Sequence, residues 1–561
     1  MKEFRETHIS FIPWRFHFFI ILLLLISLLL FSRLIHLAIF QKQFLESESN
    51  SRILRSVTAP GFRGMILDRN GYPLAISASV FSVWMNPKDF EPTLENLKNL
   101  GQLLKIKPVS IRELSTRYKK TNREFIYLKR DVSPPIAQKI KSLNISGVNL
   151  QQDYKRYYPE GEVLSHVIGF TNIDDKGQEG LELLHDQWLT GTPGKKMVIK
   201  DRLGRVVSNV RDVQKQKTGN DLVLSINRRI QYLAYRELMA GVKANNADSG
   251  SLIVLDVKTG EILAMVNQPS FNPNNRPFES KDALRNRAVT DVFEPGSTIK
   301  AFSVASALDS GLYKPSTLID TSPGRIKVGN KILHDEHNNG VLSVTQVLQI
   351  SSNVGATKMI LSLPKDQLWS MLHRVGFGEM TNVGLPGERS GELVKPVNTS
   401  PISLATLAFG YGLSVTTLQL ADAYAVLANH GIKIPLSILR VVKQPEGQRV
   451  LDAKVADQML QVLESVVEKG GTGRPADIPG YRIAGKTGTA WIAGPYGYEK
   501  HRYVSSFVGI APASDPRYVV AVVIHNPKGK NYLGGYVSGP VFRKVMEGTL
   551  HLLNIPTDAE V

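Results

Sequence analysis

A serine and a lysine three residues apart are the first pair in this sequence that could do covalent chemistry. Ser297 follows a Pro-Gly turn at the start of a segment that is expected to be helical, and Lys300 lies one turn further along. A helix N-terminus favours developing negative charge, and side chains three residues apart are neighbours. A desolvated lysine whose pKa falls toward neutrality can remove the serine proton and create a nucleophile. Alone, the pattern more often marks a helix cap beside a surface lysine.

A second polar group, Ser351 and Asn353, lies between two short segments with helical apolar patterns, residues 344–350 and 354–360. At a helix junction, a serine and an asparagine can relay a proton and hold a substrate carbonyl. The same residue types are ordinary helix caps, so this group alone indicates little.

A third group is the glycine-spaced run at residues 485–489, which reads Gly-Lys-Thr-Gly-Thr. With Gly480 it also fits the phosphate-binding pattern G-x-x-x-x-G-K-T, which requires a strand before the loop and a helix after it. The flanking residues are rich in turn formers, so a nucleotide site is excluded. We expect a strand instead, in which Gly488 lets a substrate backbone approach closely. Three polar side chains of this strand could bind a carboxylate: Lys486, Thr487 and Thr489.

Composition restricts the classes of protein to which these groups can belong. The chain has 561 residues, enough for roughly two to four domains, and its 42% hydrophobic and 21% charged residues are typical of folded proteins. It contains no cysteine, which excludes disulfide scaffolds, zinc–thiolate sites and iron–sulfur clusters. Its 68 Lys and Arg against 50 Asp and Glu give a net charge of +18, which indicates an anionic partner such as nucleic acid, a membrane surface or an acidic polymer.

The N-terminal segment selects among these partners. Residues 16–40 form an apolar stretch long enough to cross about 30 Å of hydrocarbon, and no small-residue cleavage site follows it. We therefore predict a retained transmembrane signal anchor at 16–40, a cytoplasmic tail at 1–15 and a polar helical stalk or linker at 41–60. The large C-terminal part then lies outside the cytoplasm, which argues against nucleic acid as the partner.

Two domains are expected to follow the stalk. Residues 61–220 mix short apolar runs, turns and helical segments, which predicts a mixed α+β domain. Within it, residues 101–160 hold 13 Lys and Arg against 5 Asp and Glu, a net +8 that fits either a solvated helical face or a patch that docks a polymer or a membrane. Residues 221–555 have strand pairs at both ends and helices between them, which predicts an α/β or α+β domain whose sheet joins the two ends; residues 556–561 form a tail.

The three polar groups occur in the order S-x-x-K, S-x-N and K-T-G, 54 and 135 residues apart, and this combination is far more specific than any one of them. With it, the chain resembles the class B, monofunctional penicillin-binding proteins, and among these most the division-specific septal transpeptidases. The resemblance covers nearly the whole chain, including segments 63–71, 156–159 and 177–180. It implies a single transmembrane helix, a non-catalytic pedestal of the dimerisation type, and a penicillin-binding domain with an antiparallel central sheet flanked by helices.

The resemblance also implies a mechanism. Ser297 would attack the D-Ala–D-Ala bond of a stem peptide with Lys300 as base, D-Ala would leave, and an amine from a neighbouring stem would resolve the acyl-enzyme and form a cross-link. Backbone N–H groups of Ser297 and Thr489 would hold the oxyanion. The implied catalytic residues are Ser297, Lys300, Ser351, Asn353 and Lys486, and the implied substrate-binding residues are Thr487, Gly488 and Thr489.

The expected partners and location follow from the same resemblance. The protein would act on peptidoglycan stem peptides, react covalently with β-lactams, and use no cofactor or metal. It would sit in the bacterial inner membrane with its catalytic domain in the periplasm at the division septum. There it would contact a polytopic septal glycosyltransferase and other division proteins.

Other functions remain open at this point. A D,D-carboxypeptidase differs only in using water as the acceptor, an elongation-specific transpeptidase differs in pedestal details, and a division scaffold needs no chemistry. A class A β-lactamase needs a further glutamate to direct water, but Glu388 and Glu392 lie in a glycine-rich loop without the expected motif. A bifunctional synthase needs a glycosyltransferase motif before residue 225, which is absent from the sequence, and a β-lactam sensor normally has further transmembrane segments.

Overall fold

The computed structural model describes residues 13–59, 61–121, 123–200, 206–275, 281–395, 400–494 and 497–559. The chain divides into two compact units. The first contains Met1–Gly61, Phe81–Asp153 and Thr192–Lys217, and the second contains Phe62–Val80, Tyr154–Gly191 and Thr218–Val561.

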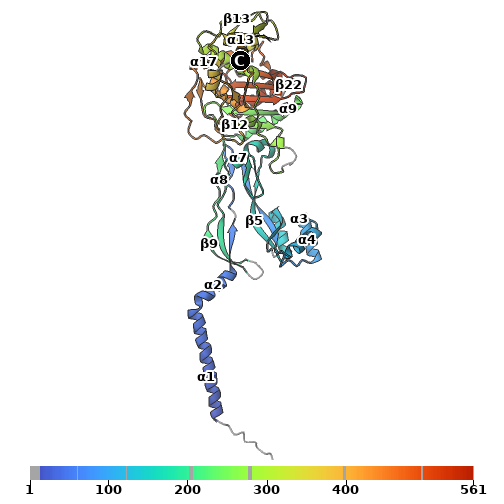
Figure 1. Cartoon of the computed structure of the whole chain (residues 1–561), viewed down its shortest axis with the longest axis vertical. Coiled ribbons are helices and arrows are strands. Elements are labelled where there is room, and N and C mark those ends of the chain that lie inside the picture. Colours follow the sequence, from blue (N-terminus) through green and yellow to red (C-terminus); the bar gives the residue numbers. More distant parts are fainter. Residues whose placement is uncertain are drawn as a thin grey trace, which may run out of the picture. The chain divides into compact units, whose positions relative to one another are not determined.

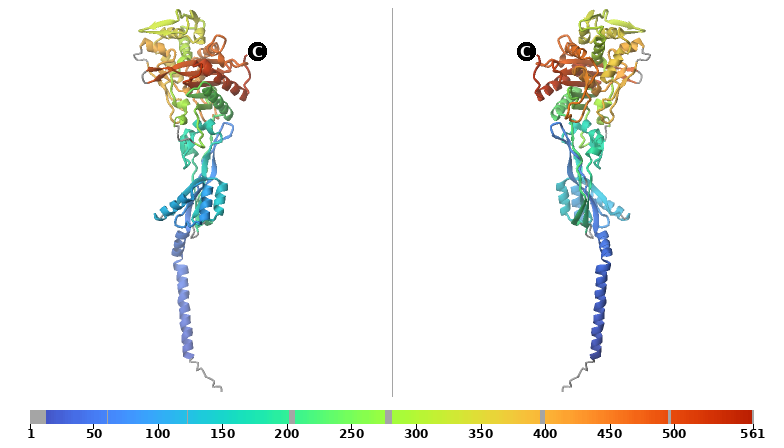
Figure 2. Two further views of the ribbon diagram at one scale, coloured as in Figure 1. Left: turned by 90° about the vertical axis from the view of Figure 1, so that its right-hand side faces the viewer. Right: turned by 90° about the vertical axis from the view of Figure 1, so that its left-hand side faces the viewer.

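The N-terminus of the first unit is a continuous apolar helix (Figures 1 and 2). Helix α1 (Pro13–Ile35) passes into a π-helical turn (His36–Phe40), and this segment has a mean hydropathy of 2.8 with no buried residues, so its length and composition suit a membrane span. Helix α2 (Lys42–Ile53) continues as the predicted stalk. Residues 54–59, which were also predicted as stalk, instead form strand β1 (Leu54–Ala59). This strand pairs with β8 (Gly194–Lys200), and β9 (Val206–Gln214) completes a sheet of order β1-β8-β9.

A second part of the first unit, residues 86–153, is here called the α3–α5 lobe. Its elements are α3 (Leu94–Leu104), α4 (Pro108–Lys119), β4 (Ile126–Val132), α5 (Pro134–Ser142) and the start of β5 (Val148–Tyr157). The apolar stripes of the helices and β4 share one small core that includes Leu97, Leu100, Ile111, Val132 and Ile140. Helix α3 begins at an N-cap, since the Thr93 side chain accepts a hydrogen bond from the Asn96 N–H.

A hairpin with its turn at residues 70–71 lies in the second unit. Strand β2 (Ile66–Leu67) pairs with the first part of β3 (Pro73–Met85), and Asp68 Oδ1 accepts hydrogen bonds from the backbone N–H groups that follow it. The remaining short elements of this segment are η2 (Gly161–Leu164), α6 (Ser165–Ile168), β6 (Phe170–Thr171), β7 (Gly177–Glu179), α7 (Gly180–Leu184), α8 (Asp186–Leu189) and β10 (Leu222–Val223).

A cluster of buried charged side chains joins several of these elements by ion pairs. The Glu182 carboxylate is fully buried and accepts from Arg63 Nε at 2.8 Å and from Arg156 Nε at 2.6 Å. Arg63 also donates to Asp186 at 2.7 Å. Both arginines are almost completely buried, and Glu182 compensates the charge of Arg156 and, together with Asp186, that of Arg63.

The large domain is built on one antiparallel sheet of order β12-β11-β23-β22-β21. Its strands are β11 (Ser249–Asp256), β12 (Ile262–Gln268), β21 (Ala484–Gly494), β22 (Gly497–Ala511) and β23 (Tyr518–His525). The pairing of Leu252 with Val522 confirms that the sheet joins the two ends of the segment. The expected antiparallel central sheet is likewise present.

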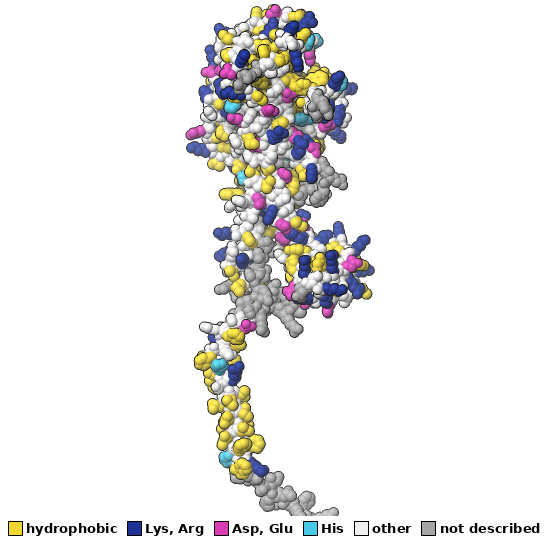
Figure 3. Space-filling view, in the orientation of Figure 1, with side chains coloured by type: hydrophobic (Ala, Val, Ile, Leu, Met, Phe, Trp, Pro, Cys, Tyr) yellow, Lys and Arg dark blue, Asp and Glu magenta, His cyan; other side chains and the backbone are white. Residues whose placement is uncertain are grey.

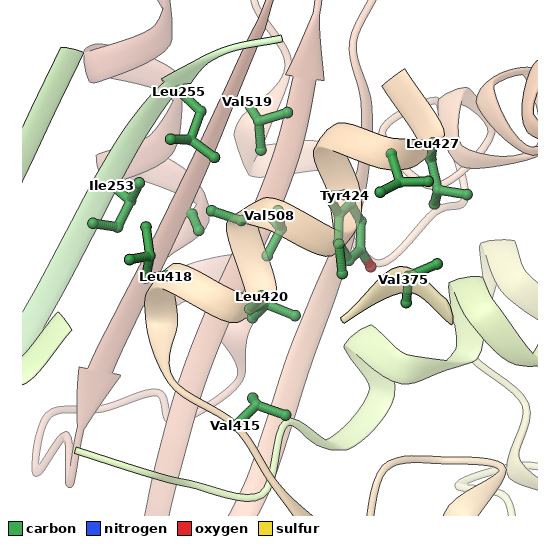
Figure 4. Close-up of a cluster of buried hydrophobic side chains, with 14 of the residues drawn as sticks. Ile253, Leu255, Val375, Val415, Leu418, Leu420, Tyr424, Leu427, Val508 and Val519 are labelled. Carbon is green, nitrogen blue, oxygen red and sulfur yellow. The ribbon is translucent and has the colours of Figure 1, made fainter. Parts of the chain in front are cut away.

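Both faces of this sheet are covered. Alternate residues of β11 enter different cores: Ile253 and Leu255 pack with α16, and Leu252 and Val254 pack with α9 and α19. Figure 4 shows the first face, where Leu418, Leu420 and Tyr424 of α16 lie against sheet residues. The main helices are α9 (Arg228–Ala244), α11 (Lys300–Asp309), α12 (Val344–Gln349), α13 (Asn353–Leu361), α14 (Gln367–Val375), α15 (Pro401–Leu407), α16 (Thr417–Ala428), α17 (Ala453–Glu464) and α19 (Gly539–Leu552).

Shorter elements complete the domain. The helical turns are η3 (Lys281–Leu284), α10 (Arg287–Thr290), η4 (Gly296–Ile299), η5 (Arg474–Ala476) and α18 (Gly534–Val537). The two-stranded pairs are β13 (Leu318–Asp320) with β16 (Val341–Ser343), β14 (Arg325–Val328) with β15 (Lys331–His334), β17 (Glu392–Leu393) with β18 (Leu413–Ser414), and β19 (Ile432–Lys433) with β20 (Gln448–Arg449).

Candidate active site

Ser297 lies in the short 3₁₀ turn η4, immediately before α11, rather than on the α-helix itself. Hydrogen bonds on both sides hold this turn. The Gly296 N–H donates to the Gly410 carbonyl at 3.1 Å, and the Tyr424 hydroxyl, from α16, donates to the Thr298 carbonyl at 2.7 Å. The Ser297 side chain is half-buried, and among the described residues its hydroxyl has no hydrogen-bond partner. The hydroxyl is therefore held in place and available to a substrate.

Lys300 is the first residue of α11, and its side chain is completely buried. Its Nζ donates to Asn353 Oδ1 at 2.7 Å, to Ser351 Oγ at 3.1 Å and to the Ser351 carbonyl. Burial lowers the pKa of Lys300 to about 7, although the nearby Asp335 carboxylate acts in the opposite direction. Near neutral pH a substantial fraction of this amine is therefore unprotonated and able to accept a proton.

Lys486, a residue of β21, also contacts Ser351. Its fully buried Nζ donates to Ser351 Oγ at 3.1 Å and to Thr487 Oγ1 at 3.2 Å. Burial lowers its pKa well below the usual lysine value, and repulsion from the Lys300 ammonium lowers it further. The Ser351 hydroxyl therefore joins two amines that cannot easily be charged together, which makes it a short path for a proton. Ser351 has a φ of +63°, and residues other than glycine adopt this conformation only when their surroundings fix it.

Asp335 is a member of this site that the sequence analysis did not identify. It follows β15, and its Oδ1 accepts from the backbone N–H groups of Asn353 and Val354 while its Oδ2 accepts from the Ser352 hydroxyl. These contacts cap the N-terminus of α13 and fix the position of Asn353. No local pattern links an aspartate after one short strand to a helix that begins 18 residues later.

The K-T-G run forms part of β21, at an edge of the central sheet, as predicted for a strand rather than a nucleotide loop. Gly488 is required there, because a Cβ atom would lie 2.3 Å from Ser506 Oγ and 2.9 Å from the Pro295 carbonyl. This close approach seats β21 beside the turn that carries Ser297. Thr489 Oγ1 accepts from the Gly534 N–H at 3.0 Å, so its own proton remains free to donate.

The structure thus brings the predicted site residues into one region. Five of them belong to a single hydrogen-bonded network: Lys300, Ser351, Asn353, Lys486 and Thr487. Ser297, Gly488 and Thr489 lie beside it where η4 meets β21. Glu388, considered above as a lactamase base, instead accepts hydrogen bonds from Thr381 and from the Gly384 N–H of its own loop.

Comparison with known proteins identifies the families of both domains. Residues 250–547 match the penicillin-binding protein transpeptidase domain, and residues 58–224 match the penicillin-binding protein dimerisation domain. The chain is 44% identical over 561 residues to the peptidoglycan D,D-transpeptidase FtsI of Escherichia coli K12, covering 99% of this chain and 94% of that protein.

Two solved structures have the same overall fold. A peptidoglycan synthetase from Bifidobacterium adolescentis is 26% identical with a TM-score of 0.71, covering 91% of this chain and 98% of that one. Penicillin-binding protein 3 from Mycobacterium tuberculosis in complex with aztreonam is 28% identical with a TM-score of 0.70, covering 90% of this chain and 98% of that one.

Proposed function

The chain belongs to the class B penicillin-binding proteins and is a peptidoglycan D,D-transpeptidase, and we propose that it works through an acyl-enzyme on Ser297. The observation that carries this proposal is the network in which Ser351 Oγ lies 3.1 Å from both Lys300 Nζ and Lys486 Nζ, beside a serine whose hydroxyl is free. This arrangement provides a base, a proton relay and a nucleophile in one place.

In the first half-reaction, the unprotonated Lys300 amine takes the Ser297 proton as Oγ bonds to the carbonyl carbon of the penultimate D-Ala. The N–H groups of Ser297 and Thr489 stabilise the resulting oxyanion. The C–N bond then breaks, and the departing D-Ala nitrogen receives a proton through Ser351. An ester on Ser297 remains.

In the second half-reaction, the amine of a neighbouring stem attacks this ester. The Ser351 relay removes the proton from the attacking nitrogen, the C–O bond breaks, and Ser297 Oγ regains its proton. The products are a new amide cross-link and the original enzyme. A β-lactam enters the same path, but its ring-opened leaving group stays attached and the ester persists.

We also propose substrate-binding roles for the residues of β21. As the edge strand, β21 offers backbone groups to an extended stem peptide, and Gly488 acts by seating this strand beside the turn that carries Ser297. Lys486, Thr487 and Thr489 lie along the strand to receive the terminal carboxylate of the donor, which is an acceptor of hydrogen bonds only.

We also propose where the protein acts. Its apolar helix at residues 14–40 anchors it in the inner membrane, with the catalytic domain in the periplasm at the division septum. There it works beside a polytopic septal glycosyltransferase and other division proteins. The similarity to FtsI of Escherichia coli over the whole chain supports this placement.

The test is the mass of the intact full-length protein after incubation with a penicillin. The wild type should gain one drug mass and Ser297→Ala none, while Ser310→Ala should label normally, because this hydroxyl only donates to the Ala307 carbonyl and accepts from the Leu312 N–H at the end of α11. Labelling of Ser297→Ala would refute the nucleophile assignment. Incubation with a pentapeptide donor and an amine acceptor should yield a cross-linked product, whereas release of D-Ala by water alone would favour a carboxypeptidase.

A further inference from the structure

The α3–α5 lobe carries a cationic surface that the transpeptidase mechanism does not use. Helix α4 and the residue after it expose Arg112, Arg117, Lys119 and Lys120, and the single acidic residue of the helix is Glu113. None of the four cations is in an ion pair with any described residue. Figure 3 shows Lys and Arg side chains gathered over this lobe. Such a surface attracts an anionic partner.

A groove of about 500 Å³ lies between α3 and α4. Its lining is divided by chemistry: Phe90, Pro92, Leu94 and Leu97 provide an apolar wall, and Arg112, Lys119 and Lys120 provide a cationic one. Apolar side chains also protrude at the helix N-termini beside it, since Leu94 is 79% exposed and Val109 is 65% exposed. A partner that fits this surface therefore has negative charge and hydrocarbon side by side.

We propose that this groove docks on the surface of an anionic phospholipid bilayer. The headgroup phosphates bind at Arg112, Lys119 and Lys120, and Leu94 and Val109 enter the boundary between headgroups and acyl chains. A glycan or an acidic polymer would satisfy the cations, but it has no hydrocarbon to cover the two protruding aliphatic side chains.

The short connection between the apolar helix and the rest of the first unit also favours a lipid bilayer as the partner of this groove. Only residues 41–53 separate the apolar helix from strand β1, and as helix α2 they span about 20 Å. The first compact unit, which includes the lobe, is therefore never far from lipid, and a surface of modest affinity is occupied because of the high effective concentration.

The absence of cysteine from the sequence allows a clean test. Thr116 lines the groove, is exposed, and uses its hydroxyl only to bond the Arg112 carbonyl, so Thr116→Cys can carry an environment-sensitive dye. The labelled full-length protein is reconstituted into nanodiscs of phosphatidylcholine alone or mixed with phosphatidylglycerol. The dye emission should shift to the blue only in the anionic discs, and high salt should reverse the shift.

Charge reversal then locates the contact. Each cation near an anionic surface raises the binding constant about fivefold. The double variant Arg112→Glu with Lys119→Glu should therefore reduce the ratio of docked to undocked protein by about 25-fold or more. The matched control is Lys139→Glu with Lys141→Glu on α5, which makes the same charge change on the same lobe outside the groove and should leave the shift in place. Unchanged circular dichroism melting verifies that each variant folds.

Three results would overturn the proposal. Equal emission in neutral and anionic discs would show that lipid charge is not recognised and would leave an acidic protein partner as the occupant. Equal loss in both double variants would show a general charge effect of the lobe. A shift produced in neutral discs by inorganic phosphate alone would identify free phosphate, rather than a headgroup, as the ligand.

Discussion

Replacing Asp335 by asparagine should move the acidic limb of acylation to lower pH. The carboxylate contacts the Asn353 N–H, and Asn353 Oδ1 in turn lies 2.7 Å from Lys300 Nζ. The Asp335 charge raises the pKa of Lys300. At an effective dielectric constant near 20, a pair of opposite charges roughly 7 Å apart is worth roughly 2 kcal/mol, or about one to two pKa units. With Asp335 present the pKa of Lys300 is about 7. Without the negative charge the ammonium is less stable, the pKa falls, and the basic amine persists at more acidic pH.

The assay is the second-order rate constant for acylation by a fluorescent penicillin, measured against pH, because this constant reports the titration of the free enzyme. Since Lys300 and Lys486 both contact Ser351, the acidic limb of the pH–rate profile reports the titration of the two lysines together rather than of one residue. The asparagine oxygen can still accept the two backbone hydrogen bonds at the start of α13, but its amide nitrogen cannot accept from the Ser352 hydroxyl, so this one contact of the cap is lost. Glu336→Gln, a weaker influence on the same amine, is the control and should shift the limb less. A lower maximal rate constant with an acidic limb at the same pH would show that Asp335 acts only by capping helix α13.

Three further outcomes are expected. Lys300→Ala should slow acylation by at least about 10²–10⁴-fold, because general-base assistance is lost, and an unchanged rate in the same penicillin assay would remove Lys300 from that role. Gly488→Ala should lower the free energy of unfolding by about 1–3 kcal/mol and slow acylation, since its methyl group meets Ser506 Oγ at 2.3 Å; chemical denaturation measures the first effect. Glu182→Ala should cost about 3–5 kcal/mol by leaving Arg63 and Arg156 buried without their shared carboxylate, and an unchanged denaturation midpoint would contradict that account.

Apolar runs bounded by turn residues were sufficient to predict strand pairs at both ends of the large domain, because β11, β12, β23 and the second half of β22 are such runs. The glycine spacing of residues 485–489 likewise indicated a strand, and the order of the three motifs indicated which side chains to expect together. These features are encoded within short windows, where the residue types themselves carry the signal.

The features that escaped prediction depend on distant partners. Strand β1 is short and mixes polar with apolar residues, so the sequence predicted it to be part of the stalk. It forms a strand by pairing with β8, more than a hundred residues later. From the sequence alone, Asp335 is an ordinary loop residue, and only the folded structure brings it to the start of α13. The 3₁₀ turn at Ser297 depends in the same way on contacts from Gly410 and Tyr424.

The pairing of β11 with β23 determines when this enzyme can first become active. Residue 252 is made near the middle of synthesis and residue 522 near its end, so β11 has only β12 beside it until almost the whole chain has been made. Contacts this far apart in sequence form late in folding. The strand carrying Lys486 joins the sheet through β22, which in turn pairs with β23, so Lys486 is the last member to reach the network. An unfinished chain thus holds Ser297, Lys300 and Ser351 without Lys486 and without the edge strand β21.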